Sequence, residues 1–271
     1  MAKNRRKPTA RTADKHVLYQ ESVQAPEEDA HFFARYYKKY TGKPLRVFRE
    51  DFCGSAILSC AFVRRHRDNH AIGVDLHGPT LEWARKHNVS SLEPEQQKRV
   101  SLVQGDVVDV RDPKAEMIAG LNFSYSVFKT RKDFAAYIQN AFKALTPGGL
   151  FALDAWGGGQ AQFLMKEKKK VKGATYVWHQ ADFDPITHHI VCKIHFEFKD
   201  GSRMKNAFIY DWRLWTLPEM RELMADAGFQ DIHVLWEGTD KETGEGNGVF
   251  RRVERGGDEE AWIAYVIGQK I

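Results

Sequence analysis

The segment "LRVFREDFCGSA", residues 45–56, reads as a β-strand that runs into a turn and then into a helix. Its first residues are mostly apolar, and the helix that follows carries a continuous apolar face. The turn contains two acidic residues and a single glycine, Gly54. Such a turn lies where α/β sheets bind their ligands, outside the carboxyl end of a parallel strand. A cofactor loop here requires further polar groups at the ends of the strands that follow.

Strands and helices alternate from this segment to residue 154. Apolar strands are predicted at residues 70–75, 100–106, 117–123 and 150–154, with helical periodicity between them. Strands that alternate with helices form a parallel sheet with right-handed crossovers. With two further strands near the end of the chain, the pattern predicts an α/β fold: a doubly wound, Rossmann-like, seven-stranded and mostly parallel sheet.

The pattern changes after the glycines at residues 157–159. Residues 188–199, "HHIVCKIHFEFK", alternate strictly and so place their apolar side chains on one side. A turn at Asp200 and Gly201 then predicts a hairpin. We therefore expect an antiparallel β insertion at about residues 172–212. Its apolar face must be covered, either by the edge of the main sheet or by the same hairpin of a second copy in a homodimer.

Two polar stretches are predicted to lie outside the core. Residues 166–170, "KEKKK", read as a solvated helix end. Residues 238–258 are polar and rich in glycine, and they are expected to be a mobile connection between the last two strands.

The net charge of +5 has a local origin. The chain has 41 lysines and arginines against 36 aspartates and glutamates. Residues 1–15 contain six basic side chains and one acidic one, which leaves 35 against 35 in the rest of the chain. A nucleic-acid-binding protein needs a basic stripe on its folded body. The balance therefore argues against a nucleic acid partner.

The three cysteines, Cys53, Cys60 and Cys192, form no C-x-x-C pair and are odd in number. This argues against a disulfide framework and against a zinc site, so no metal is predicted. No apolar run approaches the roughly 18 residues of a membrane span, and the first residues lack the apolar core of a secretory signal. The sequence predicts a cytoplasmic protein without a membrane partner.

Acidic residues end the predicted strands in register. Asp75 follows the second strand, 21 residues after Gly54, where a cofactor with a ribose needs a carboxylate for its hydroxyl groups. Asp106 ends the third strand, and Glu50 and Asp51 end the first. Carboxylates at three neighbouring strand ends predict that the turn at residues 50–56 is a cofactor loop. A dinucleotide enzyme is the nearest alternative, but the turn lacks the G-x-G-x-x-G spacing.

With "EDFCGSA", "GVDLHGPTLEWAR", "QGDVVD", "LNFSYSVF" and "LTPGGLFALD", the chain resembles the class I S-adenosylmethionine-dependent methyltransferases over roughly residues 45–155. The resemblance implies one methyltransferase domain at residues 27–271, preceded by a basic arm and N-terminal lid at residues 1–26. It departs from the family where Phe52 and Ala56 replace two glycines. It implies S-adenosyl-L-methionine as cofactor, with contacts from Tyr19, Glu50, Asp51, Cys53, Gly54, Asp75, Leu76, Asp106, Val107 and Asn122.

Methyl transfer is a displacement at a sulfonium carbon, so the enzyme mainly supplies positioning and a shaped site. The resemblance gives as catalytic candidates Asn122, Tyr125, Asp154, Trp212 and Arg213. Trp212 and Arg213 point to opposite faces of an extended segment, and we expect Arg213 to face the acceptor, as the partner of a carboxylate.

The first functional hypothesis is a small-molecule methyl acceptor that is methylated at an N or O atom. The alternative is a methyltransferase acting on RNA or protein that is recruited by the basic N-terminal arm. A third hypothesis is a cofactor-binding scaffold without catalytic activity.

Overall fold

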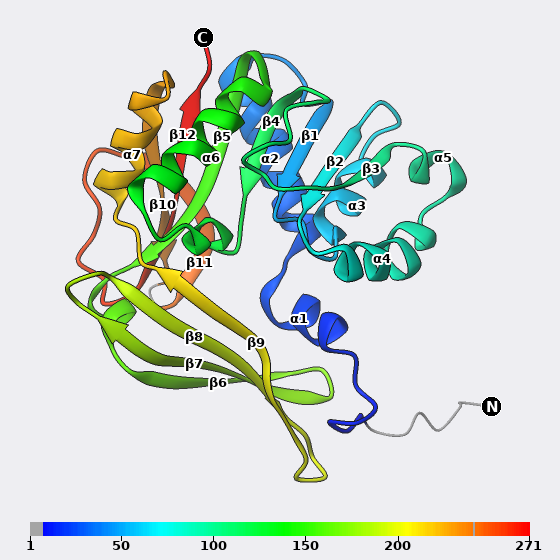
Figure 1. Cartoon of the computed structure of the whole chain (residues 1–271), viewed down its shortest axis with the longest axis vertical. Coiled ribbons are helices and arrows are strands. Elements are labelled where there is room, and N and C mark those ends of the chain that lie inside the picture. The colour runs from blue at the N-terminus through cyan, green and yellow to red at the C-terminus, as the bar shows by residue number, and fades with distance from the viewer. Residues whose placement is uncertain (1–7, 241) are drawn as a thin grey trace. The chain divides into compact units, whose positions relative to one another are not determined.

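The computed structural model describes residues 8–240 and 242–271, and the chain divides into two compact units. The larger unit comprises Ala25–Ala161 and Trp215–Ile271. The smaller unit comprises Gln162–Leu214 together with the N-terminal segment up to Gln24. Figure 1 shows the strands and helices of each unit.

The larger unit is built on a sheet that has eight strands within the described residues, in the order β11-β10-β12-β5-β4-β1-β2-β3. Five neighbouring strands are parallel: β1 (Val47–Asp51), β2 (His70–Asp75), β3 (Val100–Gln104), β4 (Ala115–Gly120) and β5 (Leu145–Gly157). Three antiparallel strands complete it: β12 (Trp262–Gln269), β10 (Gln230–Thr239) and β11 (Gly246–Val253). The predicted doubly wound, mostly parallel sheet is confirmed.

The expected number of strands was too low by one. The stretch predicted as a mobile connection, residues 238–258, contains β11, which pairs antiparallel with β10. An edge strand needs few apolar side chains, and Phe250 supplies the contact that fixes it. Its ring packs on those of Tyr265 (4.6 Å between centroids) and Phe32 (5.5 Å). Pattern analysis missed the strand because glycines and charged residues surround that single aromatic residue.

Helices cover both faces of this sheet. They are α2 (Pro26–Thr41), α3 (Ile57–Arg64), α4 (Gly78–His87), the single turn α5 (Pro94–Gln97), α6 (Arg131–Ala144) and α7 (Leu217–Asp226). Buried residues of α6 and α7 form one core with Ile118 and Phe151, and those of α2 and α3 form a second core with Phe48 and Leu150. Neighbouring strand residues thus contribute to opposite cores, as the alternation of a strand requires.

The smaller unit contains a four-stranded antiparallel sheet in the order β6-β7-β8-β9 within the described residues. Its strands are β6 (Met165–Val171), β7 (Ala174–Asp184), β8 (His189–Glu197) and β9 (Arg203–Arg213). The predicted antiparallel insertion is confirmed, but residues 166–170 form a strand and not a helix end. Lys166 pairs with His179 and Lys170 with Thr175, so Lys166, Lys168 and Lys170 lie on one face of the sheet.

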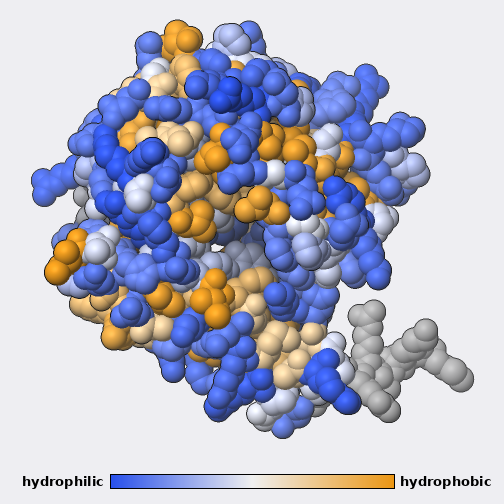
Figure 2. All heavy atoms as spheres, in the orientation of Figure 1, coloured by the Kyte–Doolittle hydropathy of each residue, from blue (hydrophilic) through white to orange (hydrophobic). Residues whose placement is uncertain are grey.

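Part of the hairpin's apolar face packs on the N-terminal segment of the same unit. Ile194, Phe196 and Phe198 share a core with Leu18 of α1 (Lys15–Val23) and with Ala13 before it. Some apolar side chains of this unit stay exposed, including Phe163, Leu164, Ile186 and Ile209. Figure 2 shows orange apolar atoms among blue ones over the four-stranded sheet.

Candidate cofactor site

The turn after β1 holds its shape without two of the expected glycines. Phe52 and Ala56 have φ of +56° and +54°, and Gly54 has φ of +50°. Left-handed backbone costs a non-glycine residue about 1–2 kcal/mol, so other contacts must stabilise the turn. The Phe52 ring meets that of Tyr137 edge-on at 5.4 Å between centroids, and Ala56 is completely buried.

The turn is also tied to the end of β2. The Cys53 N–H donates to the carbonyl oxygen of Val74 at 3.0 Å, and the Gly54 N–H donates to Oδ2 of Asp75 at 2.8 Å. A Cβ atom placed on Gly54 would meet no atom within 4 Å in the described part of the chain. The amide of Gly54 is therefore held by Asp75, while the side of Gly54 where a Cβ would lie is open.

Asp75 is fixed by two backbone amides. Besides the Gly54 bond, its Oδ1 accepts the N–H of His77 at 2.8 Å. A carboxylate has about four lone-pair sites, so Asp75 keeps acceptor capacity for two neighbouring hydroxyl groups. The next side chain, Leu76, is 67% exposed. Its exposure suits an apolar contact with a ligand beside Asp75.

The loop after β3 is fixed mainly by residues that sequence reasoning missed. Asn140 of α6 donates to the carbonyl oxygens of Val107 (2.7 Å) and Val110 (2.9 Å). Arg49, completely buried in β1, donates to the same Val110 oxygen at 2.7 Å. Asp106 accepts from an amide within the loop, while Val107 is buried in the core. A charged residue inside an apolar strand is the signal that could have identified Arg49.

Glu50 and Asp51 point into the protein and hold elements together. One oxygen of Glu50 accepts both the N–H (3.0 Å) and the hydroxyl (2.7 Å) of Ser59 in α3. Asp51 accepts from Arg49 at 2.6 Å and from the Tyr137 hydroxyl at 3.1 Å. Burial raises the pKa of Glu50 to about 8. Burial also raises the pKa of the Cys53 thiol, so it stays protonated.

Asp154 of β5 holds the segment after β4. Its two oxygens accept the N–H groups of Asn122 (2.6 Å) and Phe123 (3.0 Å). Both residues have left-handed backbone, with φ of +55° and +56°. Two such residues in succession are a strained arrangement that needs outside support. Burial raises the pKa of Asp154 to about 7.

Tyr125, the other candidate on this segment, lies in the core. Its hydroxyl donates to the sulfur of Met220 at 3.5 Å, and its ring stacks on Phe134 at 5.1 Å. Burial raises the pKa of this hydroxyl well above its usual value. The position suits packing better than proton transfer.

Asp29 is a further acidic residue near this edge that the sequence did not single out. It lies in the first turn of α2, and burial, with a smaller effect of Glu28, raises its pKa to about 6. Its charge raises the pKa of both Glu50 and Asp154, so it lies within electrostatic reach of each of them. In the sequence Asp29 looks like an ordinary acid at a helix N-terminus. The cluster would favour a cationic ligand.

The remaining predicted residues belong to the smaller unit. Tyr19 packs on Phe208 (4.9 Å between ring centroids), and Trp212 stacks on Tyr210 (4.3 Å). By strand register Phe208, Tyr210 and Trp212 share one face of the sheet, whereas Arg213 lies on the opposite face. The structure therefore brings Tyr19 and Trp212 to the same face and separates Arg213 from them.

No helix in the described residues is long and apolar enough to cross a membrane. Within residues 8–240 and 242–271, His, Cys, Asp and Glu form no group of three or more that could hold a metal ion.

Comparison with known proteins agrees with this geometry. A model described as "Methyltransferase domain" matches residues 52–149. An amino pentose methyltransferase from Micromonospora echinaspora, solved with S-adenosylmethionine, superposes with a TM-score of 0.67 at 15% identity, covering 94% of this chain and 96% of that one. A methyltransferase from Clostridium acetobutylicum superposes with a TM-score of 0.68 at 14% identity, covering 94% and 96%.

Two curated relatives are carboxy-S-adenosyl-L-methionine synthases. The protein from Aeromonas hydrophila is 28% identical over 183 residues, which is 63% of this chain and 62% of the relative. The one from Shewanella sediminis is 36% identical over 103 residues, which is 37% of this chain and 39% of the relative. The match thus spans less than two thirds of either relative.

The fold, the loop and the matching domain define a class. Residues 52–149 match a methyltransferase domain, and the chain has the fold of solved S-adenosylmethionine-dependent methyltransferases, as its sequence predicts. Methyltransferases of this fold use S-adenosyl-L-methionine as cofactor, and one of the similar structures is solved with it bound.

Replacing Gly54 by alanine tests the open side of the loop. We expect Gly54→Ala to lower the free energy of unfolding by about 1–2 kcal/mol, because φ stays positive. Its methyl group lies on the open side, so the affinity for S-adenosylhomocysteine, measured by calorimetry, should fall at least tenfold. Gly42→Ala is the matched control, because Gly42 has φ of +75° and equally open surroundings. Equal affinity in the two variants would refute the assignment.

Asp75→Ala removes the carboxylate that we expect to hold the ribose. Losing a pair of charge-assisted hydrogen bonds costs about 1.5–3 kcal/mol, or roughly ten- to over a hundredfold in affinity for S-adenosylhomocysteine. Asp68→Ala removes the same charge from the turn before β2, at the other end of that strand, and should bind normally. Unchanged calorimetric binding by Asp75→Ala would show that the carboxylate does not contact the ligand.

Glu50 should make stability depend on pH. Its pKa is about 8 in the folded chain against a usual 4.5, so the folded state binds an extra proton between these values. The free energy of unfolding should therefore fall as pH rises from about 5 to 8, on the order of 1 kcal/mol per pH unit from this group. Urea unfolding of Glu50→Gln should show a shallower slope than that of the exposed control Glu82→Gln. Equal slopes would exclude Glu50 as the source.

Proposed function

We propose that this chain transfers the methyl group of S-adenosylmethionine to an N or O atom of a small molecule, and that an amine nitrogen is the acceptor. The observation that carries the proposal is the loop of Gly54 and Asp75, which is fixed from behind and open on the side where a ligand would bind. The cluster of Asp29, Glu50 and Asp154 supports it, because S-adenosylmethionine carries a sulfonium and an ammonium group.

The cofactor roles follow from the donors and acceptors present. Asp75 would accept the ribose hydroxyl groups, and Leu76 would offer its exposed side chain to the apolar part of the nucleoside. Asp106 would accept from the adenine amino group. Asp154 would act as a positioning residue, because both of its oxygens already hold the Asn122–Phe123 backbone.

The proposed acceptor surface is the aromatic group on the four-stranded sheet, in which Trp178 and Tyr210 are half-buried and Trp212 is 3% exposed. Trp178 lies 6.2 Å from Tyr210 and 6.4 Å from Trp212 between ring centroids, and Trp212 stacks on Tyr210. Indole and phenol faces attract ammonium groups, which suits an amine acceptor better than a carboxylate. The sequence led us to expect that Arg213 faces the acceptor. We now propose that Trp212 does so instead. A sugar N-methyltransferase is among the proteins of similar fold.

The two carboxy-S-adenosyl-L-methionine synthases suggest a different product. A carboxylate added at the methyl group would need a cation beside it. Five carboxylates lie near the loop, those of Asp29, Glu50, Asp51, Asp75 and Asp154, and Arg49, the one buried arginine among the described residues, already pairs with Asp51. The electrostatics therefore favour transfer of an uncharged methyl group. Mass spectrometry of the reaction products separates the two functions.

A methyltransferase acting on RNA or protein is the remaining candidate, and the distribution of charge supports it. Residues 1–24 and 162–214 together contain 16 basic and 8 acidic side chains, a net +8. The larger unit has 25 against 28, a net −3. Without residues 1–15 the smaller unit has 10 basic and 7 acidic side chains, a net +3, so the neutral body inferred from the sequence averages two units of opposite sign. Turnover that falls steeply with salt, or that is lost when residues 1–12 are deleted, would favour this candidate.

Substitutions at Trp212 and Arg213 test the acceptor surface. S-adenosylhomocysteine release would be measured with a panel of amino sugars and other primary amines, with the matching alcohols beside them. Trp212→Leu should raise the apparent KM for the amine at least tenfold while leaving cofactor affinity unchanged, and Trp212→Phe should restore most of it. Arg213→Gln should behave like the unmodified protein. A large effect at Arg213 with none at Trp212 would instead indicate an anionic acceptor.

A further inference from the structure

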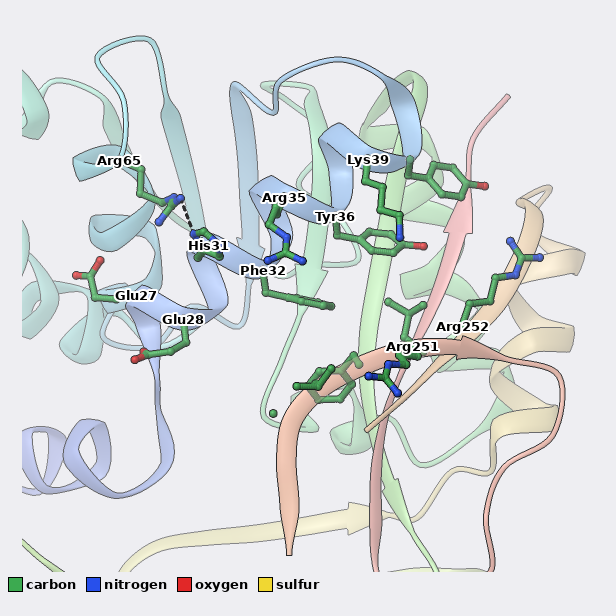
Figure 3. A pocket seen from close by; sticks show the side chains of 15 residues that line it. Glu27, Glu28, His31, Phe32, Arg35, Tyr36, Lys39, Arg65, Arg251 and Arg252 are labelled. Atoms are coloured by element: carbon green, nitrogen blue, oxygen red, sulfur yellow. Dashed lines mark hydrogen bonds between the residues drawn. The ribbon is translucent and has the colours of Figure 1, made fainter. Parts of the chain in front are cut away.

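The larger unit contains a cavity of about 780 Å³ between α2 and the edge strand β11, shown in Figure 3. No residue of the Gly54 loop, of the Asp75 turn or of the Asp106 loop lines it. Its volume lies within the usual range of small-molecule sites, roughly 300–1,000 Å³. The cavity is therefore separate from the cofactor site and large enough for a ligand of its own.

Aromatic rings from both elements form one side of this cavity. Phe32 and Tyr36 of α2 stack at 6.0 Å between centroids, and Phe250 of β11 packs on Phe32 at 5.5 Å. The Tyr36 hydroxyl bonds to His233, so its ring is held in place. Burial raises the pKa of Tyr36 to about 12, so the ring stays uncharged. Preformed aromatic faces of this kind suit a planar ligand.

Cations surround the rings. Arg35 and Lys39 extend from α2, and Arg251 from β11, as Figure 3 shows. In the described part of the chain these three form no hydrogen bond or ion pair, whereas Arg252 makes two bonds to Asp231 at 2.8 and 3.0 Å. Unpaired cations converging from two elements favour an anionic ligand.

The acidic residues of the cavity lie at its other end. Glu27 and Glu28 begin α2, and Glu27 pairs with Arg64 at 3.5 Å. Arg35 lies seven positions after Glu28, which is about 10 Å along a helix. The rings and the three unpaired cations therefore form a positively charged end of the cavity.

We propose that this cavity is a second ligand site that binds a planar aromatic ring carrying a phosphate or carboxylate group. The ring would stack on Phe32, Tyr36 and Phe250, and the anion would bind Arg35, Lys39 and Arg251. Arginine offers a forked pair of donors that fits a phosphate or a carboxylate equally well. The proposal therefore specifies an aromatic anion but does not distinguish between these two acidic groups.

Calorimetry with the unmodified protein tests the site, with S-adenosylhomocysteine present throughout. Guanosine 5′-monophosphate and 2-naphthoate are the probes, because they represent the two sources of the anion. We expect at least one to bind, with guanosine and inorganic phosphate at least tenfold weaker. Binding of neither probe would overturn the proposal, and equal binding of inorganic phosphate would overturn the role of the rings.

Charge-removing variants locate the binding. Arg35→Gln with Lys39→Gln should weaken the probe at least tenfold, and so should Arg251→Gln. Lys38→Gln with Lys43→Gln removes the same charge from exposed residues at the end of α2 that do not line the cavity, and should bind normally. Equal affinity in the two double variants would place the ligand elsewhere. All variants are at exposed positions, so circular dichroism should show unchanged folding.

Discussion

The architecture of the cofactor site depends on a turn that must pass through left-handed backbone without the glycines that make this easy. Phe52 and Ala56 both adopt the required conformation. They do so because the turn is anchored on two sides: a main-chain bond joins Cys53 to the end of β2, and the Phe52 ring is packed beside Tyr137. The strain is offset by packing and hydrogen bonds, and Gly54 is left as the one position where the main chain stays uncovered.

Hydrogen bonds also offset an unfavourable arrangement, the burial of carboxylates, along the edge of the sheet. Glu50, Asp51 and Asp154 are all buried, and each accepts hydrogen bonds that join two elements. Burying a carboxylate lowers the stability of the fold unless the carboxylate accepts hydrogen bonds. Each of these carboxylates therefore holds its hydrogen-bond donors in place. Burial raises the pKa of Glu50 and of Asp154, so their ionised forms are disfavoured, and only Asp51 has a paired cation, Arg49. A positively charged cofactor would stabilise the ionised carboxylates. The stability of this sheet edge and its affinity for a cation are therefore linked.

Much of the larger unit could be predicted because its signals are local. The alternation of apolar strands with periodic helices, and the acids that end the strands, are visible in short windows of sequence. What could not be predicted depends on partners far away in the chain. The strand β11 is fixed by one ring, Phe250, between Phe32 and Tyr265, and β6 is defined by its pairing with β7.

In the candidate site, too, the residues with local sequence signals were predicted and those that act on distant parts of the chain were not. Asp75 lies beside the Gly54 amide, as its spacing indicated, although contact of either residue with a cofactor stays a prediction. Arg49 and Asn140 were missed because they act through main-chain oxygens of a loop about 30 or more residues away. The cytoplasmic location and the homodimer also stay predictions.

The position of β12 has a consequence for how the chain is made. This strand, Trp262–Gln269, pairs with β5 on one side and β10 on the other. Until β12 leaves the ribosome, the edge of β5 opposite β4 has no neighbouring strand. The pair β10 and β11 likewise has no strand through which to join the sheet. The parallel half of the sheet can assemble during translation, but the larger unit closes only afterwards. A growing chain therefore exposes an apolar strand edge until β12 emerges, and chaperones would be the natural protection against pairing with other chains during that time.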